Sequence, residues 1–201
     1  MIKLKDILLE GKPPSIFIPR RIEGRIERMI MLYVRNGSKG DLDLSGFNPH
    51  RLKLTKLPEI LKNVSVDGSF DCGNNKLTSL INAPKSVVIS FYCGTNHLTS
   101  LEGAPTNVGI SFYCGNNELT SLEGAPKTVD GDFFCGYNLL TSLAGAPKSV
   151  GVDFDCSNNK LTSLAGAPKT VGRHFYCHNN PVKFTEAQVR AVCDVKGKIL
   201  V

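Results

Sequence analysis

Six cysteines recur along the chain at intervals of 21 residues, and a thiol can bind soft metals or change its redox state. The six are Cys72, Cys93, Cys114, Cys135, Cys156 and Cys177. No His and no second Cys accompanies them at positions that would point inward, so the pattern lacks a set of metal ligands. A free cysteine also packs as a small apolar side chain. We therefore interpret the six as core residues and expect no metal and no other cofactor.

Carboxylates and imidazoles occupy neighbouring positions of the same pattern. Asp132 and Asp153 hold one position in consecutive repeats, and Asp155 lies two residues further on. Paired carboxylates suit glycoside hydrolysis or calcium binding. No insertion between these repeats would build a pocket, so we expect a flat acidic patch and no catalysis. His174 and His178 would be about 13 Å apart on one strand, too far to share a zinc ion.

The cysteines belong to a repeat that reads approximately Val-Gly-x-x-Phe-Tyr-Cys-Gly-Asn-Asn-x-Leu-Thr-Ser-Leu-x-Gly-Ala-Pro-Lys-Thr. Its six copies begin at Val66, Val87, Val108, Val129, Val150 and Val171. A fixed period in the twenties is typical of a solenoid, in which each unit buries its apolar face on its neighbours. The sequence predicts an α/β solenoid dominated by β-structure. We expect it to be right-handed, with parallel strands and short helical caps at both ends.

Within each copy, Phe-x-Cys alternates as a short strand does, with Phe and Cys inward. An Asn three residues after each Cys is identical in every copy, while the residue before it varies. The invariant residues are Asn75, Asn96, Asn117, Asn138, Asn159 and Asn180. We expect these amides to be buried and to bind backbone groups where the strand turns away. A coil of 21 residues leaves little room for a convex helix, so extended or turn structure is expected on the other side.

The residue between Phe and Cys should point outward, and three consecutive copies place an aromatic ring there. This outward position holds Asp71, Tyr92, Tyr113, Phe134, Asp155 and Tyr176. Such a row either stabilises neighbouring strands or provides the aromatic anchors of an interface. We favour binding, with contacts through Tyr92, Tyr113, Phe134 and Tyr176. The side chains of Asp132, Asp153, Asp155 and His174 would then set specificity.

The pattern Phe-x-Cys-x-x-Asn-x-Leu-x-x-Leu resembles the leucine-rich-repeat signature, and Ala-Pro-x-x-Val resembles the short bacterial subclass. The cadence Leu-Thr-Ser-Leu-Glu-Gly-Ala-Pro is similar to repeat proteins of large tailed bacteriophages, over residues 64–183. The resemblance implies a concave binding face and a protein partner of host or phage origin. It also implies a location in the host cytoplasm or the virion.

Both ends depart from the repeat. We expect a flexible peptide with a Pro-Pro linker over residues 1–14, a capping helix within 15–40, the solenoid over 41–183 and a C-terminal cap over 184–201. Apolar residues at helical spacing predict the first helix between residues 19 and 34. Thr185 and Gln188 form a candidate capping box at the start of a second one.

The first ten residues form one short amphipathic segment, which either docks on the body or serves as a detachable tag. Leu8-Leu9-Glu10-Gly11 resembles the site at which a phage head protease trims internal head proteins, between Glu10 and Gly11. The alternative function is therefore a virion structural protein, or an internal head protein delivered with the DNA.

The net charge of +6 comes from 24 Lys and Arg against 18 Asp and Glu. Residues 1–65 hold thirteen and seven of these, which leaves eleven of each sign in the repeats. Arg21, Arg25, Arg28 and Arg35 follow helical spacing, but Glu23 and Glu27 interrupt them, so nucleic-acid binding is not expected. The sequence has no apolar run long enough for a membrane span or a secretory signal.

Overall fold

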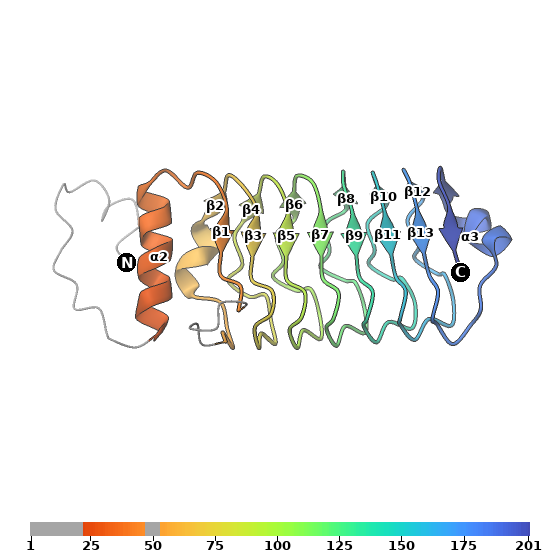
Figure 1. The fold of residues 1–201 in the computed structure, drawn as a ribbon, viewed down its shortest axis with the longest axis horizontal. Coiled ribbons are helices and arrows are strands. Elements are labelled where there is room, and N and C mark those ends of the chain that lie inside the picture. The colour runs from red at the N-terminus through yellow and green to blue at the C-terminus, as the bar shows by residue number, and fades with distance from the viewer. Residues whose placement is uncertain (1–21, 47–52) are drawn as a thin grey trace.

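A computed structural model describes residues 22–46 and 53–201 of the chain. These residues wind into a parallel β-solenoid whose coils stack along one axis (Figure 1). The fold class predicted from the 21-residue repeat is confirmed. Glu10, Gly11 and the rest of the predicted N-terminal peptide and linker lie outside the described residues.

One face of the solenoid is a parallel sheet of eight two-residue strands. In spatial order they are β1 (Leu42–Asp43), β3 (Phe70–Asp71), β5 (Phe91–Tyr92), β7 (Phe112–Tyr113), β9 (Phe133–Phe134), β11 (Phe154–Asp155), β13 (Phe175–Tyr176) and β15 (Ile199–Leu200). Equivalent residues of successive coils are paired, for example Tyr92 with Tyr113 and Tyr113 with Phe134. Each outward side chain therefore lies beside its counterpart in the next coil.

A second side of the coils, joined to the first by a corner of three residues, is extended as well, as the repeat length predicts. A three-stranded sheet contains β2 (Ser65–Val66), β4 (Ser86–Val87) and β6 (Asn107–Val108). A four-stranded sheet contains β8 (Thr128–Val129), β10 (Ser149–Val150), β12 (Thr170–Val171) and β14 (Asp194–Val195). In each strand the Val is buried and the preceding residue is more exposed.

The core is a set of columns, because every coil contributes the same side chains at the same height. In the eight-stranded sheet, the first residue of each strand from β3 to β13 is a fully buried Phe, and the centroids of neighbouring rings are 5.0 to 5.8 Å apart. The six repeat cysteines and most of the Leu and Val residues of the repeat lie in the same core. Stacked rings and aliphatic side chains exclude water along the whole axis, which gives the outward residues a rigid support.

Helices cover the two ends of the stack (Figure 1). Near the N-terminal end lie α2 (Ile22–Arg35), which buries Ile26 and Ile30, and the 3-10 helix η1 (Glu59–Asn63), which buries Leu61. At the other end is α3 (Glu186–Val192). The capping box is present: Gln188 N donates to Thr185 Oγ1 at 3.3 Å, and Thr185 N donates to Gln188 Oε1 at 2.8 Å. None of the helices in the described part combines the length and apolarity needed to cross a membrane.

Candidate functional site: the outward face of the eight-stranded sheet

An asparagine ladder fixes the point at which each strand of this face ends. Asn117 is buried, and its Nδ2 donates to the carbonyl oxygens of Cys93 and Cys114, both at 3.1 Å. Its Oδ1 accepts the N–H of Leu98 at 3.0 Å. The same bonds recur at Asn75, Asn96, Asn138, Asn159 and Asn180, the last of which is half-buried. Each amide therefore ties its own coil to the preceding one.

The variable residue before each ladder Asn has a left-handed backbone. The six residues are Asn74, Thr95, Asn116, Tyr137, Asn158 and Asn179, with φ between 51° and 57°. Asn tolerates this conformation better than other residues with a side chain, which explains its presence in four of the six copies. Thr95 and Tyr137 hold it against their own preference. The sequence analysis noted the variation but missed this backbone constraint.

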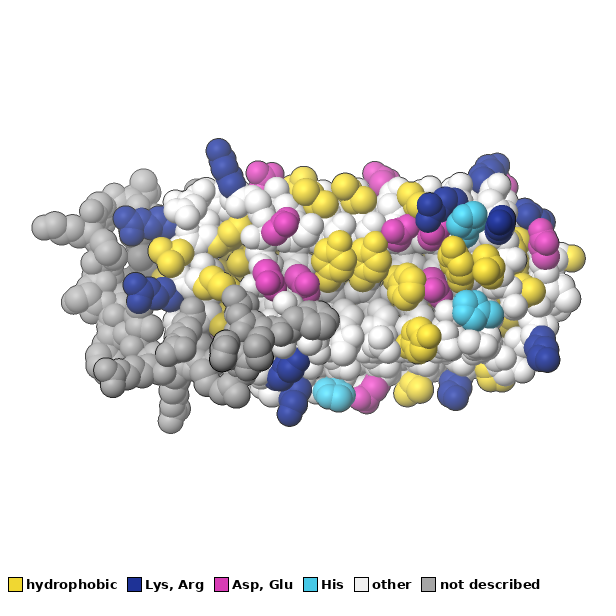
Figure 2. Space-filling model, viewed as in Figure 1, with side chains coloured by type: hydrophobic (Ala, Val, Ile, Leu, Met, Phe, Trp, Pro, Cys, Tyr) yellow, Lys and Arg dark blue, Asp and Glu magenta, His cyan; other side chains and the backbone are white. Residues whose placement is uncertain are grey.

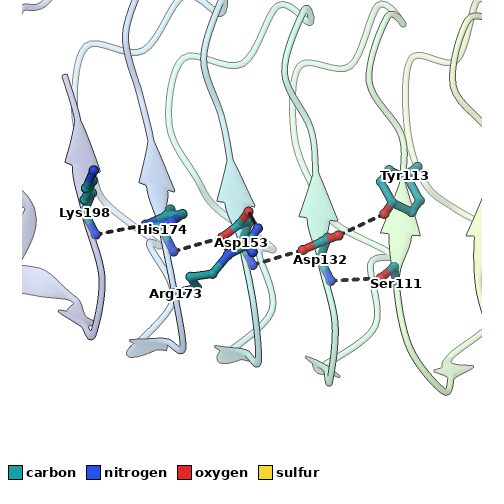
Figure 3. Close-up of polar contacts among 7 residues, drawn as sticks. All are labelled: Ser111, Tyr113, Asp132, Asp153, Arg173, His174 and Lys198. Carbon is teal, nitrogen blue, oxygen red and sulfur yellow. Dashed lines mark hydrogen bonds and ion pairs between the residues drawn. The ribbon is translucent and has the colours of Figure 1, made fainter.

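A second line of hydrogen bonds crosses the outward face one residue before each Phe of the core. We call Ser90, Ser111, Asp132, Asp153 and His174 the outer ladder. Each accepts the backbone N–H of its counterpart in the next coil. Figure 3 shows the part from Ser111 to Lys198, with distances of 2.9 to 3.1 Å.

The outer ladder gives Asp132, Asp153 and His174 a structural role that the sequence analysis did not predict. The sequence did not reveal this role, because the residue types differ from copy to copy. Ser, Asp and His can each accept a hydrogen bond through a side-chain atom. These residues still present polar atoms on the face. A partner would contact the side-chain atoms that are not used in the outer ladder.

The aromatic row consists of Tyr92, Tyr113 and Phe134, side by side on β5, β7 and β9. Tyr92 and Tyr113 stack with centroids 4.7 Å apart and planes 6° apart, and Phe134 is tilted at 6.3 Å from Tyr113. Tyr113 Oη donates to Asp132 Oδ2 at 3.0 Å. Burial and the neighbouring Asp132 carboxylate raise the pKa of Tyr113, so its hydroxyl remains a donor. The rings thus stabilise one another and still present an aromatic surface, which Figure 2 shows across the middle of this face.

Asp155 corrects the sequence analysis. It occupies the expected outward position between Phe134 and Tyr176, but its side chain is only 7% exposed. Its Oδ1 accepts the Ser157 N–H at 2.8 Å and the Ser157 hydroxyl at 2.6 Å. The carboxylate serves the local turn and is not an exposed contact. It also separates Tyr176, which meets His174 edge-on at 6.0 Å, from the aromatic row.

Charges are distributed unevenly over the face. From β1 to β11, we consider the outward strand residues together with the residues two positions before and two positions after them. They include Asp41, Asp43, Asp71, Asp132 and Asp153 besides the buried Asp155. These columns contain no Lys or Arg. Arg173 reaches in from the corner of the next coil and binds both oxygens of Asp153, which lowers the pKa of that carboxyl. Among the described residues no cation pairs with Asp132.

Three large apolar side chains are exposed in coil four, the copy of the repeat that begins at Val129. Other exposed apolar side chains lie in the three preceding copies: Ile81, Val88, Ile89 and Ile110. Phe134, Tyr137 and Leu139 are 36%, 55% and 44% exposed, and we call these three the coil-four anchor. The sequence analysis selected only Phe134. The signal for the other two lay in the repeat itself. Where coil four has Tyr137 and Leu139, four of the other copies have Asn at the first position, and the second position holds Lys, His, Glu, Lys or Pro.

The remaining candidates for chemistry do not assemble into a reactive site. All seven cysteines are buried and free, and desolvation raises the pKa of each repeat thiol. Within residues 22–46 and 53–201, no group of three or more His, Cys, Asp or Glu is placed to hold a metal ion. Two depressions of about 370 and 430 Å³ lie near the two ends of the solenoid and do not include the aromatic row.

Comparison with protein-family models, with curated proteins and with solved structures finds no match to this chain. Function is therefore inferred from the residues of the face alone. The exposed rings and carboxylates of this sheet lie outside both depressions and do not line an enclosed space of the kind that binds small molecules. The geometry of the sheet suits contact with a macromolecular surface.

Proposed function

We propose that this protein is a recognition module that binds another protein through the outward face of the eight-stranded sheet, with no catalytic step. The observation that supports this most directly is the aromatic row flanked by carboxylates. Exposed aromatic side chains on a solvent-facing sheet are costly to leave unpartnered, and Tyr and Phe are typical interface anchors.

The support beneath the row also favours binding. The asparagine ladder and the outer ladder bond successive coils on both sides of the rings, so the side chains are held in place before a partner arrives. A preorganised surface loses less conformational entropy on association. Eight strands about 4.8 Å apart give a face roughly 34 Å long, enough for an interface of ordinary size.

The origin of the protein in a large tailed phage, and a host or phage protein as its partner, are part of this proposal. They rest on the sequence cadence of residues 64–183. The alternative, a virion or head-packaged protein, is favoured by Leu8-Leu9-Glu10-Gly11. Mass spectrometry of purified virions tests that alternative: it requires the protein to be present and to begin at Gly11. Absence, or presence only with residues 1–10 intact, contradicts it.

The triple substitution Tyr92→Ser, Tyr113→Ser and Phe134→Ser tests the binding proposal. The parent and the triple variant are used as baits in the same extract, and captured proteins are quantified by mass spectrometry. We expect a partner that the parent enriches and the variant loses, while the variant still unfolds cooperatively. Equal capture by both baits would show that the face is not the interface.

A further inference from the structure

The repeats act as an internal control for what the fold itself requires. Because all coils share one backbone, a side chain that departs from the other copies without improving the packing needs another explanation. Coil four departs at three exposed positions in the apolar direction: Phe134 replaces Tyr or Asp, Tyr137 replaces Asn or Thr, and Leu139 replaces a charged residue, His or Pro. None of the three is needed for the buried columns of the core.

Tyr137 is also unfavourable for the fold. It holds a left-handed backbone (φ 57°) that Asn adopts with less strain, and its ring is 55% exposed. An aromatic side chain that is both strained and solvated contributes little to folding. Residues of this kind collect at functional sites, where the contact they make with a ligand offsets the strain.

The charge beside Phe134 is complementary to a cation, whereas Leu139 lies between Glu118 and Lys160 of the neighbouring coils. The strand columns from β1 to β11 carry carboxylates and no Lys or Arg, although the chain as a whole is basic. Asp153 pairs with Arg173, whereas Asp132 forms no ion pair within the described residues. Asp132 accepts the Asp153 N–H and the Tyr113 hydroxyl, and Arg173 acts on it only through space. Tyr92 and Tyr113 stack face to face, so Tyr113 presents its ring edge and its hydroxyl beside Asp132. Figure 2 shows these carboxylates bordering the hydrophobic row.

We propose that the partner presents a basic segment in which a Lys or Arg lies within a few residues of an apolar side chain. The apolar side chain packs on the coil-four anchor, and the cation lies against the Asp132 carboxylate. Residues 132 and 134 are about 7 Å apart along the strand, so one short extended segment reaches both. This inference rests on the proposed function and specifies the chemistry of the partner.

Two synthetic octapeptides test it, one repeating Lys-Leu-Gly-Arg and the other with Gln in place of every Lys and Arg. They are titrated into the full-length, nitrogen-15-labelled protein, and backbone amide shifts are followed by NMR. We expect the basic peptide to shift amides of residues 111–139 and to bind at least ten-fold more tightly than the Gln peptide. Added salt should weaken its binding.

Two substitutions and a matched control sharpen the result. Asp132→Asn keeps an oxygen for the Asp153 N–H but loses the charge, and Tyr137→Asn restores the residue common in the repeat. Each substitution should weaken the binding of the basic peptide at least five-fold. The Tm of Tyr137→Asn should be no lower than that of the parent. Glu123→Gln makes the same charge change at an exposed turn that precedes β8, and it should leave the affinity unchanged.

Equal binding of the two peptides, shifts outside this face, or equal effects of Asp132→Asn and Glu123→Gln would overturn the inference. A natural partner that needs Tyr92 and Tyr113 but docks an acidic or uncharged segment would overturn it too, and would leave the proposed function standing. If the triple Ser variant captures the same proteins as the parent, the proposed function itself fails.

Discussion

Loss of one ladder amide should destabilise the solenoid far more than loss of its exposed neighbour. In Asn117→Ala the N–H of Leu98 loses the only acceptor that the structure shows for it. The carbonyls of Cys93 and Cys114 each lose one donor but keep another, from Asn96 and Asn138 respectively. The mutation therefore leaves one buried donor unpaired and weakens two acceptors.

These contacts set the magnitude. An unpaired buried N–H costs about 1–3 kcal/mol, and each hydrogen bond lost from a carbonyl that keeps another partner costs about 0.5–1.5 kcal/mol. We expect a loss of about 2–6 kcal/mol, which for a chain of this size lowers Tm by roughly 10 °C. Asn116→Gly, at the exposed left-handed position, should change stability by under about 0.5 kcal/mol. Asn116→Ala should cost about 1 kcal/mol, because Ala resists φ of 55°.

Denaturant unfolding of the three variants measures these differences, and hydrogen exchange at the Leu98 amide gives a local readout. Exchange at Leu98 should accelerate in Asn117→Ala and remain at the parent rate in Asn116→Gly. Equal unfolding midpoints for Asn117→Ala and Asn116→Gly, or a Leu98 amide protected as before, would refute the ladder as a source of stability.

Two further predictions concern side-chain chemistry. The seven thiols should resist iodoacetamide at pH 8 in the folded protein and should all react in denaturant. Burial raises the pKa of these thiols, to about 11 for Cys177 and Cys193. Rapid labelling of a repeat cysteine in the folded protein would contradict its assignment to the core. Arg173→Ala should lower stability at pH 7, and its difference from the parent should shrink as the pH falls below 3.8. Arg173 lowers the folded-state pKa of Asp153 below its ordinary 3.8, so the stabilisation exists above that value and disappears as the pH falls through the folded pKa. A difference that persists unchanged at pH 2, measured by denaturant unfolding, would rule out this ion pair as its origin.

The architecture could be predicted from the sequence because the same 21-residue pattern occurs in six copies. A position that never changes, such as Asn117, indicates a shared structural need, and alternation around Phe and Cys indicates the strand. The ends were less repetitive, yet the apolar spacing of α2 and the Thr185–Gln188 box were enough to indicate helices. Both patterns depend on residues close together in the sequence, and the helices that they predict are formed by the same residues.

The site was harder to predict because it depends on what lies beside each residue in the next coil. Asp155 has an outward position in the strand pattern, but its neighbours and Ser157 bury it. The outer ladder was not predicted because its members are different residue types that have only a side-chain hydrogen-bond acceptor in common. Tyr137 seemed only variable, since the left-handed backbone that makes it unusual is not visible in the sequence.

The central claim is that the outward face of the eight-stranded sheet is the binding surface. Site-specific photocrosslinking tests it most directly, with a photoreactive phenylalanine analogue at position 134 or, as a control, at position 128. Thr128 is exposed on the four-stranded sheet, across the corner that precedes β9. In cells that naturally contain the protein, position 134 should give a discrete protein adduct, identified by mass spectrometry, that disappears when Tyr92 and Tyr113 are replaced by Ser. Position 128 should give none. An adduct of the same protein from both positions, or from position 128 alone, would contradict the account.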